Sequence, residues 1–222
     1  MANEKNETTS ERRRGRPGNI SLEKIVEAAL DIGFRGISMH TIARRLNVAV
    51  SALYRHVGSK DELLLLCTDI VSQKIVLPET DSWQEHLRVL ARNYRKVTLS
   101  MPGSVEFVRE VGLTTPAACA VVDRSIAVLR ESGFQGDLAY MTCIGMISHA
   151  TDMALHEEQD RRNVSLRGGA EVEEVLRAMK DQYPNIGWAL AGDFLLNREE
   201  YFELGLRVYI NGIEIALREQ MA

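Results

Sequence analysis

Residues 38–60 contain two short helical patterns separated by a very short connection. The first apolar stripe consists of Met39, Ile42, Ala43 and Leu46, and the second of Val50, Leu53, Tyr54 and Val57. Only three residues, Asn47 to Ala49, lie between them. Because one helix cannot continue into the other, the two must cross at a steep angle. This arrangement is typical of a helix-turn-helix, whose second helix is free to enter the major groove of DNA.

Charge is unevenly distributed along the chain. Residues 1–60 contain 11 Lys or Arg against 6 Asp or Glu, whereas residues 61–222 contain 16 against 25. The overall net charge of -4 therefore combines a basic N-terminal part of +5 with an acidic remainder of -9. A local excess of cations favours binding to the phosphates of a duplex, which repel an acidic body.

Length and composition indicate a globular protein. A chain of 222 residues that is 45% apolar suffices for one large or two small domains. No apolar run approaches the roughly 18 residues of a membrane helix, and the N-terminus lacks the apolar core of a signal peptide. We therefore expect a cytoplasmic protein without membrane contact. Cys67, Cys119 and Cys143 are widely spaced and odd in number, which argues against a disulfide framework or a zinc site.

Residues 1–18 are expected to form a flexible basic arm. The segment is polar, ends in Arg12-Arg13-Arg14-Gly15-Arg16-Pro17-Gly18, and has no residues that could form a buried face. Its guanidinium groups are able to enter a minor groove beside the main contact. We favour the alternative of a solvated tail with only non-specific attraction, because the sequence does not show where such an arm lies.

Residues 19–66 are expected to form one helical domain. Ser21 is a suitable N-cap for a first helix that ends before Gly33, and Ser38 caps the next helix. The residues from Ser59 to Glu62 form a capping box for a fourth helix that continues through Val71. Exposed amides at the start of this helix, together with Lys60, suit a phosphate group.

Residues 21–66 resemble the DNA-binding domain of the TetR (tetracycline-repressor) family of bacterial transcription regulators. The strongest similarity to the family's Leu-Tyr-x-His-Phe-x-x-Lys-x-x-Leu core lies in Leu53-Tyr54-Arg55-His56-Val57-Gly58-Ser59-Lys60-Asp61-Glu62-Leu63, which follows Ile42-Ala43-Arg44-Arg45-Leu46-Asn47-Val48. Residues 82–88, 202–206 and 212–214 resemble the tetracycline-repressor branch of C-terminal domains. The resemblance implies an all-α, non-enzymatic homodimer that binds a double-stranded DNA operator.

The candidate DNA-binding residues have side chains suited to phosphates or bases. They are Ser38, His40, Arg44, Val50, Ser51, Ala52, Tyr54, Arg55, His56 and Lys60. Tyr54 and His56 can each donate to a phosphate oxygen, and the alternative that they pack in the core is less favoured because Leu53 and Val57 already supply core positions. The resemblance assigns base contacts to His40 and to residues 50–52, and His40 or Arg55 can approach guanine acceptors. Arg44 is a possible phosphate contact, whereas Arg45 is expected on a solvated face.

Residues 67–222 are expected to form an effector-binding and dimerisation domain. Helices are predicted near 83–100, 104–113, 117–132, 136–158, 170–182 and 198–219. By resemblance, the helices near 136–158 and 198–219 pair with their copies in a second subunit, with small residues allowing close approach. Two heads about 34 to 36 Å apart would then require a near-palindromic operator.

The resemblance also implies a pocket for a small-molecule effector. Candidate lining residues are His86, Leu90, Tyr94, Met101, Phe107, Met141, His149, Asp152, Met153 and His156. Each such residue is more often part of a core than of a pocket. His149, Asp152 and His156 share a helix face that is compatible with an acidic ligand or a metal, but a hydrated face is favoured. Met101 stands where the tetracycline repressor would place a metal-chelating histidine, so we expect a hydrophobic or aromatic effector and neither a metal nor a cofactor.

An enzyme and a DNA-binding protein without a ligand are the two alternatives to a sensor. An enzymatic body is disfavoured because the sequence contains no Gly-x-Ser-x-Gly, His-Glu-x-x-His, P-loop or Gly-x-Gly-x-x-Gly context. A DNA-binding architectural or regulatory dimer whose body binds no small ligand is the alternative to a sensor.

Overall fold

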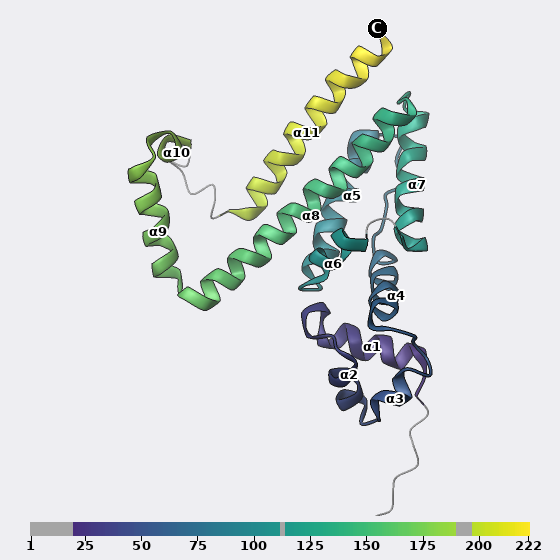
Figure 1. Ribbon diagram of the computed structural model, residues 1–222. Coiled ribbons are helices and arrows are strands. Elements are labelled where there is room, and N and C mark those ends of the chain that lie inside the picture. Colours follow the sequence, from purple (N-terminus) through teal and green to yellow (C-terminus); the bar gives the residue numbers. More distant parts are fainter. Residues whose placement is uncertain (1–19, 112–113, 190–196) are drawn as a thin grey trace, which may run out of the picture.

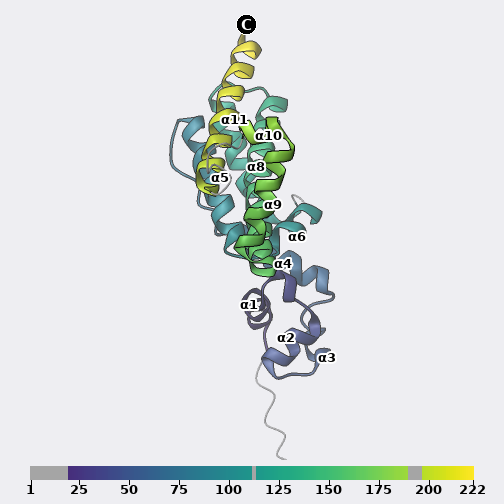
Figure 2. The ribbon, with the colours of Figure 1, turned by 90° about the vertical axis from the view of Figure 1, so that its left-hand side faces the viewer.

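The computed structural model describes residues 20–111, 114–189 and 197–222, and within these ranges the chain is helical without a strand. A small head lies at one end of an elongated molecule, and a larger helical body extends from it (Figure 1, Figure 2). The expectation of an all-α fold is confirmed. No helix in the described ranges is both long enough and apolar enough to span a membrane.

The head contains α1 (Leu22–Ile32), the 3-10 turn η1 (Phe34–Gly36), α2 (Met39–Leu46) and α3 (Val50–Leu53). Serine side chains determine where its first two α-helices begin. Ser21 Oγ accepts a hydrogen bond from the backbone N–H of Lys24, and Ser38 Oγ accepts one from that of Thr41. Both predicted N-caps are thus confirmed. Because an unsatisfied first turn is costly, each cap contributes about 1 kcal/mol.

The head and the first part of α4 (Lys60–Ser72) enclose one hydrophobic core. Ile25, Ile42, Leu53 and Leu63 are fully buried there, and burial of each such side chain stabilises the fold by about 1.5–3 kcal/mol. Three apolar side chains of the body pack against the same cluster, namely Val97, Met101 and Phe107. The head is therefore packed onto the body and is not merely tethered to it.

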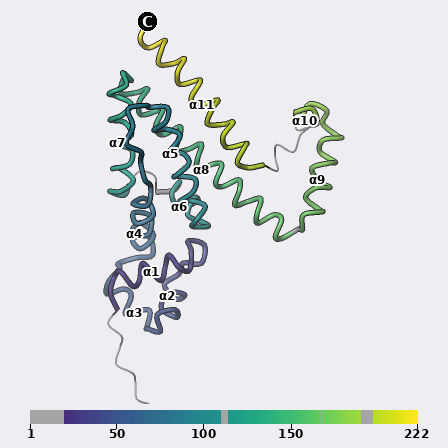
Figure 3. The backbone as a smooth tube through the Cα atoms, turned by 180° about the vertical axis from the view of Figure 1, so that it is seen from behind, coloured from purple at the N-terminus to yellow at the C-terminus, as the bar shows by residue number. Residues whose placement is uncertain are grey.

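The body is built from α5 (Trp83–Leu99), α6 (Ser104–Val111), α7 (Pro116–Glu131), α8 (Gly136–Arg167) and α11 (Arg198–Met221). Their apolar faces form a second core that includes Leu87, Leu129, Met146, Phe202 and Ile210. α11 runs back along α8 in the opposite direction (Figure 3). Because Phe202 and Leu206 are buried, α11 is an integral part of this core.

Two features of the region after residue 158 differ from the sequence-based expectation. α8 continues to Arg167, where Gly168 ends it with a φ of 85° that favours glycine. α9 (Gly169–Gln182) is followed by a short α10 (Pro184–Ala189), which was not predicted and which begins at a proline suited to a first helical position. Neither helix has a buried residue, and both stand away from α4 to α7 (Figure 3). The last two residues of the helix predicted near 104–113 lie outside the described residues.

Candidate DNA-binding surface and effector pocket

The second helix of the helix-turn-helix is shorter than its apolar stripe suggested. α3 comprises Val50–Leu53, and the backbone then turns, with the N–H groups of His56 and Val57 both donating to the carbonyl of Leu53 at 2.8 and 3.1 Å. The predicted burial of Leu53 and Val57 is nevertheless confirmed, with exposed fractions of 0% and 1%. These two anchors hold the turn against the head and direct the intervening residues outward.

The candidate phosphate contacts lie on the outside of this turn and at the start of α4. Tyr54 is 50% exposed, and His56 and Lys60 are exposed, as is the neighbouring Arg55, a candidate base contact. Ser59 Oγ caps α4 by accepting from the N–H of Glu62. The Glu62 carboxylate accepts from Gly58 N–H at 2.7 Å, so the predicted capping box closes one residue earlier than expected.

The candidate base contacts differ in accessibility. His40 and Ser51 are exposed and Val50 is half-buried, whereas Ala52 is only 7% exposed because its side chain faces the head. The hydroxyl of Ser38 is engaged in the cap of α2. Ala52 and Ser38 therefore support the head itself, and we do not retain them among the proposed DNA contacts.

The two neighbouring arginines of α2 have different surroundings. Arg44 is exposed, and Arg45 forms an exposed ion pair with Asp31 at 2.7 Å. Arg45 thus lies on a solvated face, as expected, but its charge is paired within the head. The basic arm, residues 1–18, lies outside the described residues.

A cavity of about 280 Å³ opens in the body where five helices meet. It is lined by Thr68 and Ser72 of α4, Tyr94 of α5, Val108 and Arg109 of α6, Ala118 of α7, and Ile144, Ile147, Ser148, Thr151 and Asp152 of α8. Its volume is near the lower end of the range of roughly 300–1,000 Å³ for small-molecule sites. The lining combines apolar side chains with several hydroxyl groups and one pair of opposite charges.

Of the ten residues predicted to line a pocket, Tyr94 and Asp152 line this cavity. His86 and Leu90 are buried, Met153 packs against the second core, and Met101 and Phe107 pack against the core of the head. Met141 is 65% exposed and His156 is exposed. His149 lies against α11. The structure therefore does not bring the predicted set together.

Four of the nine lining residues that sequence reasoning missed are small and carry a hydroxyl group. Thr68 and Ser72 are one helical turn apart on the predicted fourth helix, and Ser148 and Thr151 lie together on α8. Polar residues in an otherwise apolar helical stripe were the available signal. Methionines and aromatic residues were predicted instead, but these large apolar side chains gain most from burial in a core.

Some of the hydrogen-bond donors in the cavity wall are already paired within the protein, and others are left for a ligand. Thr68 and Thr151 donate their hydroxyl hydrogens to carbonyls of their own helices, at 2.9 and 2.8 Å. Burial raises the pKa of Tyr94 to about 12, so this hydroxyl stays protonated at neutral pH. Arg109 Nη1 lies 2.8 Å from Asp152 Oδ1. Within the described residues, no cluster of three His, Cys, Asp or Glu side chains is arranged to hold a metal ion.

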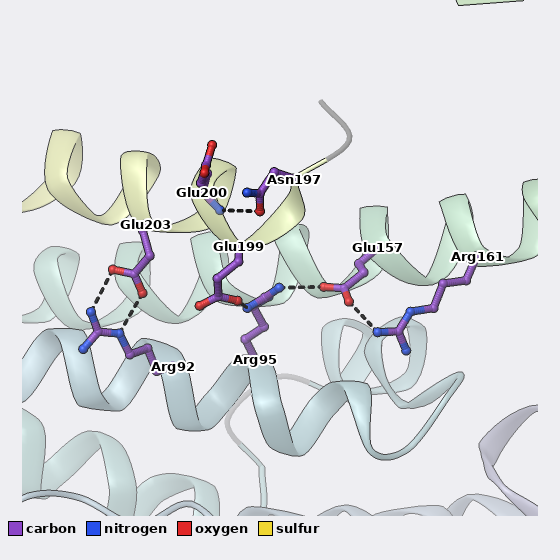
Figure 4. A network of polar contacts seen from close by, with 8 residues as sticks. All are labelled: Arg92, Arg95, Glu157, Arg161, Asn197, Glu199, Glu200 and Glu203. Carbon is purple, nitrogen blue, oxygen red and sulfur yellow. Dashed lines mark hydrogen bonds and ion pairs between the residues drawn. The ribbon is translucent and has the colours of Figure 1, made fainter. Parts of the chain in front are cut away.

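A polar network ties α5, α8 and α11 together (Figure 4). The Arg95 guanidinium donates to Glu157 of α8 at 2.8 Å and to Glu199 of α11 at 2.6 Å, and it lies 4.7 Å from the centre of the Phe202 ring. Arg92 adds a two-pronged contact with Glu203 at 2.7 Å, which lowers the pKa of that carboxyl. Paired hydrogen bonds of this kind fix geometry as well as charge.

His149 makes a second link between α8 and α11. Its ring stacks on Phe202 and tilts against Tyr209, with centroid separations of 5.7 and 5.0 Å. A Cβ at Gly205 would lie 2.4 Å from His149 Cε1, so glycine is needed for this close approach. Gly205 therefore admits a side chain of its own subunit.

The chain matches two models of one protein family. The model described as "Bacterial regulatory proteins, tetR family" matches residues 21–67, and "Tetracyclin repressor-like, C-terminal domain" matches residues 77–217. An HTH-type transcriptional regulator of Saccharopolyspora erythraea is 28% identical over 210 residues, covering 87% of this chain and 84% of the relative. The HTH-type transcriptional repressor DrrR1 of Streptomyces coeruleorubidus is 23% identical over 222 residues, covering 93% and 82%.

Solved structures give the same relationship. Apo ActR from Streptomyces coelicolor superposes with a TM-score of 0.77 at 27% identity, covering 92% of this chain and 99% of ActR. ActR in complex with actinorhodin gives 0.76 at 26% identity, covering 90% and 97%. Together with the helix-turn-helix head and the helical body, these matches confirm the resemblance seen in the sequence. The chain belongs to the TetR family of bacterial transcriptional regulators.

Proposed function

We propose that the chain is a ligand-responsive repressor, in which a homodimer binds a near-palindromic operator and releases it when a small effector enters the cavity. The observation that carries the proposal is the double role of α4. Its first turn presents Lys60 at the outer surface, Leu63 and Leu64 are buried in the head, and Thr68 and Ser72 line the cavity. One helix therefore contacts both proposed binding sites.

The proposed DNA contacts fall into two groups. Arg44, Tyr54, His56 and Lys60 would bind phosphates, since all four present exposed donors. Arg44 lies on α2, and the other three lie on the turn or at the N-terminus of α4. The base-contacting group consists of His40 in the first turn of α2, Val50 and Ser51 of α3, and Arg55 just after α3. Phosphate contacts would position the head, and the base contacts would select the sequence.

Exposed apolar side chains on α8 and α11 support homodimerisation. Tyr140, Met141, Val208, Tyr209 and Ile215 are each between 45% and 65% exposed. A Cβ at Gly145 or Gly212 would meet nothing within 4 Å, so both helices offer flat positions for a neighbour. Apolar surface of this kind marks an interaction site, and a symmetric dimer would bury the same surface on both subunits.

The proposed switch is a change in the position of α4. A ligand packed against Thr68 and Ser72 would displace this helix relative to the body and so alter the spacing of the two heads. A hundredfold loss of operator affinity corresponds to about 2.7 kcal/mol of coupling, which is ordinary for linked binding sites. ActR has been solved with actinorhodin and DrrR1 is named a repressor, which supports a small-molecule effector and negative regulation. The hydrophobic or aromatic character of the effector rests on the apolar side chains that line the cavity.

Selection of bound sequences from random duplexes tests the DNA-binding part of the proposal. We expect enrichment of an inverted repeat whose half-sites are about one helical turn apart. Absence of enrichment at modest ionic strength would contradict it. A compound library is then screened for thermal stabilisation together with release of the selected operator. Stabilisation without release, or no stabilisation by any compound, would favour a DNA-binding dimer without a sensor function.

A further inference from the structure

Arg109 and Asp152 are the two charged residues among the described side chains that line the cavity. They come from α6 and α8, and the pair is half-exposed, with exposed side-chain fractions of 56% and 45%. An ion pair this accessible contributes little to folding. The presence of this ion pair in the wall of the cavity is therefore better explained by ligand binding than by stability.

Among the described residues that line the cavity, a hydrogen-bond donor is free, but no carboxylate is free to accept. The Tyr94 hydroxyl keeps its proton and has no hydrogen-bond partner among the described residues. The one carboxylate among the described lining residues, that of Asp152, already accepts a hydrogen bond from Arg109. A ligand that brings its own negative charge would satisfy Arg109 and Tyr94 together, because both donate to anionic oxygens.

If a ligand breaks the ion pair, Asp152 finds another partner more easily than Arg109 does. Asp152 has an exposed histidine on its own helix, His156, four residues after it, where side chains are neighbours. The acid at the corresponding distance from Arg109 on α6 is Glu106, which is already paired with Arg35 at 3.0 Å. A cationic ligand taking Asp152 would thus leave Arg109 without a described acidic partner, whereas an anionic ligand replaces one carboxylate by another.

We propose that Arg109 recognises an anionic group, such as a carboxylate or sulfonate, on an amphipathic effector whose rings pack against Val108, Ile144 and Ile147, and that Asp152 yields its place to this group. The inference rests on the proposed function in taking the cavity as the effector site. It adds the charge of the ligand and the residue that selects it.

Two fluorescent dyes with the same aromatic body test this selection. Anilinonaphthalene sulfonate carries the anion, and phenylnaphthylamine is its neutral counterpart. Titration of the full-length protein is expected to show tighter binding of the sulfonate. Arg109→Gln should weaken sulfonate binding about five- to tenfold and leave the neutral dye unchanged, because one charge-assisted hydrogen bond is lost. Asp152→Asn should tighten sulfonate binding, because the competing carboxylate is removed.

Arg130→Gln is the matched control, since Arg130 is also exposed near a helix end but lies outside the cavity. If Arg109→Gln lowers the thermal midpoint of unfolding, Arg109→Lys is measured as well. This variant retains the positive charge and should bind the sulfonate more tightly than Arg109→Gln does. Equal changes for both dyes, or unchanged sulfonate binding in both cavity variants, would overturn the proposal. If the charge selection is found but bound dyes or library compounds never release operator DNA, the regulatory function fails and the recognition by Arg109 stands.

Discussion

Arg35 of the head and Glu158 of the body form an ion pair across their junction, with Arg35 Nη2 2.9 Å from Glu158 Oε2. The Glu158 side chain is 5% exposed, and it also accepts a hydrogen bond from Gly103 N–H at 3.2 Å. Burial raises the pKa of Glu158, so its ionised form depends on these two donors. The same guanidinium reaches Glu106 of α6, the helix that carries Arg109. The junction thus lies one helical turn from the cavity wall.

Arg35→Gln is expected to lower the free energy of unfolding by about 1–2 kcal/mol, because a buried carboxylate loses its charged donor. Urea denaturation of the full chain at neutral pH measures the loss. Arg45→Gln serves as the control, since the pair of Arg45 with Asp31 is more than half exposed on both sides and should contribute less than about 0.5 kcal/mol. Similar losses in the two variants would show that the burial of Glu158 has no energetic consequence.

Gly103→Ala is expected to disturb the same junction through steric contact. Gly103 has a φ of 85°, and an added Cβ would lie 2.4 Å from Arg35 Cγ and 3.0 Å from the Arg35 backbone nitrogen. Gly133 has a φ of 94° with nothing within 4 Å of its Cβ position. Both substitutions should cost about 1 kcal/mol through the positive φ. An additional loss of about 1–2 kcal/mol is expected at Gly103 alone.

The comparison of unfolding free energies between Gly103→Ala and Gly133→Ala isolates the contact with Arg35, because φ is positive and similar at both sites. Operator affinity, measured on the same samples, should fall further in Gly103→Ala if the junction positions the head. An identical cost at the two glycines would mean that the backbone accommodates the new methyl group without moving Arg35.

Local features of the fold were predictable from the sequence. Ser21 and Ser38 were identified as caps because an N-cap depends on residues within one helical turn, and both accept the expected hydrogen bonds. Burial of Leu53 and Val57 followed from their spacing. The same periodicity did not predict that the helix ends at Leu53, because the apolar pattern continues into a turn with a similar spacing of side chains.

Contacts between distant segments were not predictable. Arg35 and Glu158 are 123 residues apart, and no pattern in either segment indicates its partner. Helical spacing shows which residues share a face and gives no information on whether that face meets a core, a cavity or solvent. For this reason His86 and Leu90, expected in a pocket, are buried, whereas the hydroxyl residues of α4 and α8 line the cavity.

Substitutions in the head should divide into two classes of DNA-binding defect. Tyr54→Phe and Lys60→Ala are expected to weaken binding to all duplexes. Lys60→Ala should reduce the salt slope by about 1.8, because each subunit of the dimer loses one phosphate contact. Ser51→Ala and Val50→Ala should instead change the preferred sequence. Fluorescence anisotropy with the selected operator and a scrambled duplex, at several salt concentrations, separates the classes.

Lys96→Ala is the matched control for these measurements, because Lys96 is an exposed lysine of α5 and lies in the body. It should leave both affinity and salt slope unchanged. If Ser51→Ala and Lys60→Ala reduce binding to the operator and to the scrambled duplex by the same factor, the division into base and phosphate contacts is wrong.

Acidification is expected to destabilise the contact between α8 and α11 through His149. Burial lowers the pKa of this ring, and its Nε2 is buried without a hydrogen-bond partner among the described residues. The folded state therefore binds fewer protons than the unfolded chain, so the stabilisation is present above the ordinary pKa of histidine and is lost as the pH falls below it. His149→Phe retains the stacking on Phe202 and removes the titration. Thermal midpoints between about pH 7.5 and 5.5 should fall less steeply in this variant, although His86, whose pKa burial also lowers, leaves part of the slope. An unchanged slope would show that His149 keeps its charge state on folding.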